Sequence, residues 1–124
     1  MNVRRLSALQ WFGFLAGGAI WFAEFLAATV TSQAVCNPAS RRWDVPHDSV
    51  ELGLMLFGVV VVGLAEAAAI VVYRATRDTE EQDPPPAGRL HFFAAAAMLA
   101  NLIFLVIIVL TGLATILDHA CHQA

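Results

Sequence analysis

The 124-residue chain contains no lysine, and only 14% of its residues are charged. Soluble domains usually carry about 25% charged residues, so this composition argues against an ordinary soluble protein. The segments outside the apolar runs are too short to bury a hydrophobic core, so we expect no soluble catalytic domain and no enzyme activity of the chain itself. The formal net charge of −3 is too small to indicate a nucleic-acid partner.

Cysteine and histidine are also scarce, with two and four residues respectively, and there is no Cys-x-x-Cys-His motif for covalent haem. The histidines, His47, His91, His119 and His122, all fall at the edges of the apolar runs, which argues against a haem within a span. His119, Cys121 and His122 offer ligands that copper or zinc accepts, but their spacing matches no strong zinc pattern. We therefore predict that the chain itself binds no cofactor and no metal, with the tail site as a minor alternative.

Three long apolar runs account for most of the chain, at about Leu9–Val35, Leu52–Tyr73 and Phe92–Leu117. A helix rises 1.5 Å per residue, so about 20 residues cross a hydrocarbon core about 30 Å thick. Each run meets that length. The sequence predicts an all-α membrane protein in which residues 1–124 form a single domain with three transmembrane helices.

We expect the helices at about 6–35, 49–77 and 89–120, with an outer loop at 37–48 and an inner loop at 78–88. Asp48 is a suitable N-cap for the second helix, and Glu51 follows three residues later, which predicts a capping box. The inner loop is acidic and then contains three consecutive prolines, Pro84–Pro86, which favour an extended polyproline arm.

The arginines predict the orientation, because cytoplasmic flanks carry an excess of basic residues. With a cytoplasmic N-terminus and a periplasmic (extracytoplasmic) C-terminus, five of the seven arginines lie inside: Arg4, Arg5, Arg74, Arg77 and Arg89. Arg41 and Arg42 then lie outside. We expect Arg89 and His91, at the inner interface, either to flank the span or to contact phospholipid headgroups.

Two carboxyl groups, Glu24 and Glu66, lie within the apolar runs. A charge at mid-bilayer costs at least about 2.5–3.5 kcal/mol, so such groups usually face the bundle interior or a partner. Asn101 falls near the depth of Glu66, which predicts a hydrogen bond between the two. These intramembrane polar residues indicate either protonated acids that bond between helices or a path for protons.

The two cysteines, Cys36 and Cys121, close the first and last helices at the same predicted outer face. Disulfides persist outside the cytoplasmic membrane, so we predict a Cys36–Cys121 disulfide. Nearer the other face, Gly13-x-x-x-Gly17 and Ala96-x-x-x-Ala100 are spacings that let helices approach closely.

A resemblance rests on Trp21, a polar residue at position 24, Cys36 closing the first helix, Arg89 opening the third and Cys121 closing it. In these features the chain resembles a group of small three-helix bacterial membrane proteins encoded with haem–copper terminal oxidases and related respiratory complexes. The resemblance implies a multi-pass protein of the bacterial cytoplasmic (inner) membrane. It also implies an accessory, non-catalytic subunit whose partners are other transmembrane subunits that carry haem and copper.

Two alternatives stay open at this point. The first is a small, proton-coupled, oligomeric transporter that uses Glu24, with Trp21 and Phe25 beside a cationic substrate. The second is an assembly factor that visits a respiratory complex and leaves it.

Overall fold

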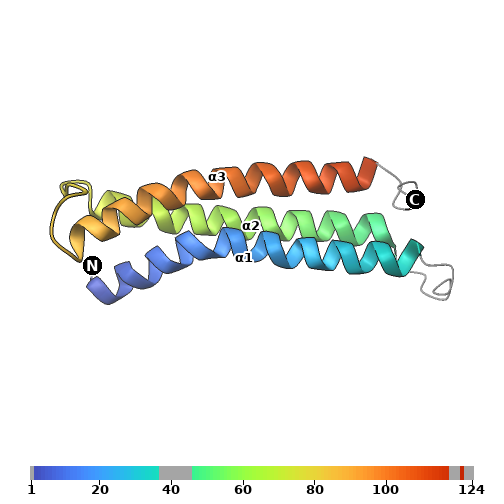
Figure 1. The fold of residues 1–124 in the computed structure, drawn as a ribbon, viewed down its shortest axis with the longest axis horizontal. Helices are drawn as coiled ribbons and strands as arrows, with labels where there is room; N and C mark the ends of the chain where they lie inside the picture. The colour runs from blue at the N-terminus through green and yellow to red at the C-terminus, as the bar shows by residue number, and fades with distance from the viewer. Residues whose placement is uncertain (1, 37–45, 118–120, 122–124) are drawn as a thin grey trace.

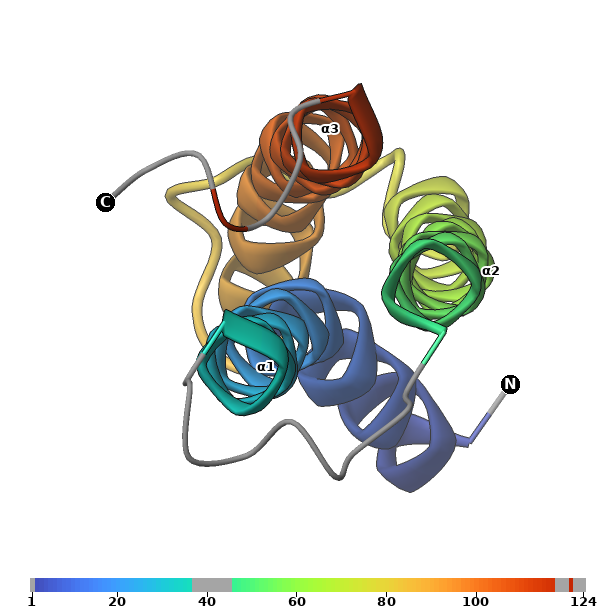
Figure 2. The ribbon, with the colours of Figure 1, turned by 90° about the vertical axis from the view of Figure 1, so that its right-hand side faces the viewer.

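The computed structural model describes residues 2–36, 46–117 and 121. They form three helices, α1 (Val3–Cys36), α2 (His47–Ala75) and α3 (Ala87–Leu117), and these described residues contain no strand. Each helix is long and apolar enough to cross a membrane, in agreement with the three apolar runs. The helices lie side by side along one axis (Figure 1), and viewed along that axis they occupy the corners of a triangle (Figure 2).

Each helix begins two or three residues before the expected position, because the helical backbone continues beyond the apolar run into the flanking residues. Most of the expected outer loop, residues 37–45, lies outside the described residues, and so do Arg41 and Arg42. The expected end of the third helix at residue 120 also falls on residues that the structure does not describe.

The predicted capping box at the start of α2 is wrong. The helix begins at His47, its N-cap is Pro46, and no side chain caps it. The backbone N–H of Val50 already donates to the carbonyl of Pro46. Glu51 is consequently available for another role, and its side chain turns into the bundle, where it is only 4% exposed.

The prediction of an extended polyproline arm is also not met, because the inner loop between α2 and α3 folds into compact turns. The Asp83 backbone N–H donates to the Glu80 carbonyl, and the Glu80 N–H donates to the Asp83 carboxylate at 2.9 Å. The loop folds back over Gly88, where a Cβ atom would lie 2.9 Å from the Glu81 carbonyl oxygen. These local hydrogen bonds outweigh the extended preference of the prolines.

The best-packed part of the bundle is the end at which α1 begins. Leu6, Val72, Leu90 and Ala94 form a buried hydrophobic cluster there, with Leu9 packed against it. The buried residues of α1 all lie in its first half: Leu6, Gln10, Gly13 and Gly17. The second half of α1 has no fully buried residue, so the two ends of the bundle are packed differently.

Candidate functional site

The close helix approach predicted at Gly13 and Gly17 is present. A Cβ at Gly13 would lie 3.1 Å from the Ala65 carbonyl oxygen, so α1 meets the α2 backbone there. A Cβ at Gly17 would lie 2.6 Å from Asn101 Oδ1, so α1 meets α3 one turn later. The two glycines therefore let α1 touch both of its neighbours.

Asn101 is the polar side chain at the centre of this contact, and it is 1% exposed. Its Nδ2 donates to the Gly13 carbonyl oxygen at 2.9 Å, which joins α3 to α1. The predicted hydrogen bond between Asn101 and Glu66 is not among those of the described residues, and the buried atoms Asn101 Oδ1 and Glu66 Oε2 have no partner. The reason is geometric, because the Asn101 amide is turned toward the glycines of α1.

Glu66 lies instead in a lateral groove between α2 and α3. The groove has a volume of about 590 Å³ and is mainly apolar, with Gly63, Ala95, Met98 and Leu102 among its lining residues. Glu66 Oε2 is buried there without a hydrogen-bond partner. An unpaired carboxyl group at mid-span is costly, so this groove is a candidate contact site for a group from outside the chain.

Glu24 reaches from α1 to α2. A Cβ at Gly58 would lie 2.7 Å from Glu24 Cδ, which shows that the carboxyl group rests directly on the α2 backbone. Its buried Oε1 also lacks a hydrogen-bond partner. Glu24 and Glu66 therefore occupy different sites, on different interfaces of the bundle.

A second cavity, of about 390 Å³, lies among all three helices in the half of the bundle beyond Glu24. Glu24 and Glu51 both line it. The Thr31 hydroxyl of α1 lies 3.3 Å from Glu51 Oε1 of α2, but the Ala27 and Ala28 carbonyl oxygens of its own helix lie closer, at 2.9 and 3.0 Å, and compete for its one proton. We call this space the three-helix cavity, and it brings together two carboxyl groups that the sequence places 27 residues apart.

The two cysteines lie at the same end of the bundle as this cavity. Cys36 and Cys121 are at disulfide distance, with Cα atoms 5.3 Å apart across a sequence separation of 85 residues. The pair joins the end of α1 to the residues that follow α3. This geometry agrees with the predicted disulfide pairing.

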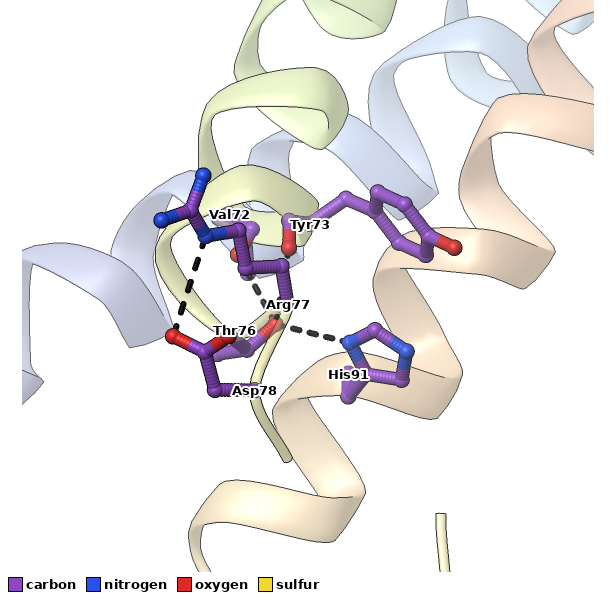
Figure 3. A network of polar contacts seen from close by, with 6 residues as sticks. All are labelled: Val72, Tyr73, Thr76, Arg77, Asp78 and His91. Carbon is purple, nitrogen blue, oxygen red and sulfur yellow. Dashed lines mark hydrogen bonds and ion pairs between the residues drawn. The ribbon is translucent and has the colours of Figure 1, made fainter. Parts of the chain in front are cut away.

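A polar network ties α2 to α3 at the opposite end (Figure 3). The Thr76 hydroxyl lies 3.1 Å from His91 Nδ1, and the His91 ring stacks on Tyr73 with the ring centroids 4.7 Å apart. The His91 imidazole is thus in contact with Thr76 and Tyr73 of the same chain. The Arg89 side chain, by contrast, is exposed. Arg89 is thus the better placed of the two for the predicted headgroup contact.

The described residues contain no group of three or more His, Cys, Asp or Glu side chains able to hold a metal ion. Of the minor tail site, only Cys121 is described, and it pairs with Cys36. His119 and His122 lie outside the described residues.

Sequence reasoning missed the polar residues Gln10, Thr31 and Glu51 inside the bundle. Gln10 is 1% exposed, and its Oε1 has no hydrogen-bond partner. The sequence feature that could have indicated the buried position of Gln10 is a single amide side chain at the start of an apolar run. The sequence pattern assigned Glu51 to a helix cap, because position along the chain gives a residue's depth in the membrane but not the direction in which its side chain points from the α2 axis.

Comparison of the chain with protein-family models, with curated proteins and with solved structures finds no significant match.

Proposed function

We propose that the chain is an accessory, non-catalytic subunit of a bacterial membrane electron-transport complex. One observation carries the proposal of a subunit, namely the Glu66 carboxyl group in the groove between α2 and α3. Its buried Oε2 has no hydrogen-bond partner within the described chain. A donor from a partner helix would satisfy this oxygen and remove the cost of leaving it bare in a membrane.

The shape of the groove fits such a partner. Small residues at its edge, Gly63 and Ala95, let a second helix approach the backbone closely. Leu99 and Leu102 supply apolar area beside them and are 64% and 57% exposed. A hydroxyl or amide side chain on the docking helix would reach Glu66.

The choice of an electron-transport complex, a terminal oxidase or a related respiratory complex, rests on the resemblance described above. In that complex the haem and copper belong to the partner subunits, and phospholipids cover the remaining apolar faces. The start of α1, the end of α2 and the start of α3 lie at one end of the bundle (Figure 1), and these segments carry Arg4, Arg5, Arg74 and Arg89. We assign this end to the cytoplasmic side of the inner membrane.

The experiment is affinity purification of the tagged chain in a mild detergent, with mass spectrometry and a haem absorption spectrum of the eluate. We expect stoichiometric co-purification of haem-bearing subunits. A colourless homo-oligomer would overturn the proposal and favour the transporter. Co-purification with incomplete complexes alone would favour the assembly factor.

A matched pair of variants tests the groove itself. Glu66→Ala removes the unpaired carboxyl group, whereas Leu64→Ala shortens an exposed side chain two residues away, on the other side of α2. We expect Glu66→Ala to reduce the yield of partner subunits and Leu64→Ala to leave it unchanged. Equal yields from the two variants would remove the groove from the docking surface.

A further inference from the structure

The three-helix cavity has no role in the proposed docking of a partner helix, because that helix docks in the groove between α2 and α3 that contains Glu66. It is lined by one stripe of α1, by the start of α2, and by about the last three turns of α3. Along α1 it extends from Trp21 to Ser32, which corresponds to about 16 Å of helical rise. A volume of about 390 Å³ falls within the range of small-molecule sites.

The hydroxyl groups that line this cavity present lone pairs to it. Thr29 Oγ1 donates its proton to the Phe25 carbonyl at 2.7 Å, and Thr115 Oγ1 donates to the Thr111 carbonyl at 2.8 Å. Each hydroxyl has one proton, so its remaining capacity is as an acceptor. Ser32 Oγ likewise donates to the Thr29 carbonyl, at 3.5 Å, so the Trp21 indole N–H and the Thr111 hydroxyl are the side-chain donors left among the described lining residues.

The carboxyl groups strengthen this excess of acceptors. Glu24 enters from α1 and Glu51 from α2, and among the described residues of the lining there is no arginine, lysine or histidine to pair with them. Glu51 is 4% exposed, and its hydrogen-bond donor is the Thr31 hydroxyl at 3.3 Å, whose one proton is shared with two closer carbonyl oxygens of α1. Two acids on different helices, with no basic side chain in the described lining, create a site that favours a positively charged donor.

Aromatic and apolar groups complete the lining. The rings of Trp21 and Phe25 stack with centroids 6.2 Å apart and an interplanar angle of 28°, and both residues line the cavity. Leu54, Met55 and Ile108 add apolar surface. Aromatic faces attract cations, and apolar walls accept a hydrocarbon body.

We propose that the three-helix cavity binds an organic ammonium ion that carries both N–H donors and an apolar body. The N–H groups donate to Glu24, Glu51 and the hydroxyl lone pairs, while the apolar body packs against Trp21 and Phe25. This site lies outside the Glu66 groove and does not rest on the accessory role.

The test measures binding of three probes to the full chain in phosphatidylcholine nanodiscs by calorimetry, with empty nanodiscs as the background. Phenethylammonium has the charge and the N–H donors, its N-trimethyl derivative has the charge alone, and phenethyl alcohol has neither. We expect phenethylammonium to bind at least tenfold more tightly than the other two. Equal binding of phenethyl alcohol, or no binding above the empty discs, would overturn the proposal.

Three isosteric variants locate the site. Glu24→Gln and Glu51→Gln each replace one carboxyl group of the cavity by an amide, and Glu66→Gln makes the same change in the groove between α2 and α3. We expect the first two to weaken phenethylammonium binding at least tenfold and the third to leave it unchanged. Unchanged binding in both cavity variants, or an equal loss in the control, would refute the assignment.

A measurement on the unaltered chain avoids any dependence on variant folding. Nuclear Overhauser effects between the ring protons of bound phenethylammonium and the Trp21 indole are expected, and their absence at saturation would contradict the proposal. A lipid headgroup is a second source of the same chemistry, because phosphatidylethanolamine carries an N–H ammonium. Competition by this lipid added to the nanodiscs would assign the site to the headgroup, and undiminished probe binding would assign it to a free amine.

Discussion

Gly17→Ala tests whether the contact between α1 and α3 holds the bundle together. The new methyl group would lie 2.6 Å from Asn101 Oδ1 and 3.3 Å from Phe104 Cδ2. Asn101 is 1% exposed and already donates to the Gly13 carbonyl, so its amide cannot move aside without losing that hydrogen bond. The added atom must therefore separate the helices or break the bond.

Overpacking of a tight interior costs about 1–3 kcal/mol, and alanine recovers at most about 1 kcal/mol through its helix propensity. We expect Gly17→Ala to lower the free energy of unfolding by about 1–2 kcal/mol. Asn101→Ala alone removes an interhelical hydrogen bond worth about 0.6–1.7 kcal/mol. In that background only the Phe104 contact remains, so the cost of Gly17→Ala falls to about 0.5 kcal/mol or less, a coupling of about 1 kcal/mol.

The assay is reversible unfolding by dodecyl sulfate in mixed micelles, followed by circular dichroism, for the wild type and all variants. Gly63→Ala is the matched control, because a Cβ there meets nothing within 4 Å. It should leave the free energy of unfolding unchanged or slightly raised. If Gly17→Ala matched this control, or if Asn101→Ala failed to relieve it, the account of helix contact given above would be incorrect.

Three further perturbations address other contacts. Cys36→Ser opens the 85-residue loop and should destabilise the bundle by about 2–5 kcal/mol, while mass spectrometry of the oxidised wild type should detect no free thiol. His91→Ala removes the contact with Thr76 and should accelerate amide exchange in the turn after α2, with a stability loss of about 0.5–1.5 kcal/mol. Gly58→Ala should destabilise the fold because its methyl group would meet the Glu24 carboxyl, and Glu24→Ala in the same chain should relieve the effect.

The number and approximate extent of the helices could be predicted because length and hydropathy alone determine a membrane span. The disulfide distance followed from topology, since the two crossings between Cys36 and Cys121, α2 and α3, return the chain to the same face. The glycine contact at Gly13 and Gly17 followed from spacing. Each of these predictions uses position along the chain, and helical rise converts that position directly into depth.

The site residues could not be predicted to the same extent, because their roles depend on direction around the helix axis. Asn101 and Glu66 lie at similar depth and both line the groove between α2 and α3, yet the Asn101 amide donates to the Gly13 carbonyl of α1 and forms no hydrogen bond with the Glu66 carboxyl group. Apolar residues surround all three helices, so the sequence pattern carries little information about which side faces inward. Glu51 shows the same difficulty, since a local capping pattern competed with an interior position.

The distribution of buried residues explains why a covalent link is useful at the end of α1. All four buried residues of this helix lie at or before Gly17, and no glycine lets its second half approach α3. Beyond that point Glu24 rests on Gly58, the Thr31 hydroxyl lies 3.3 Å from Glu51 Oε1, and the three-helix cavity occupies the space between the helices. A bridge at Cys36 limits the separation of α1 from α3 without filling the cavity. Loss of the bridge in Cys36→Ser should therefore increase amide exchange in the second half of α1 and leave the first half protected.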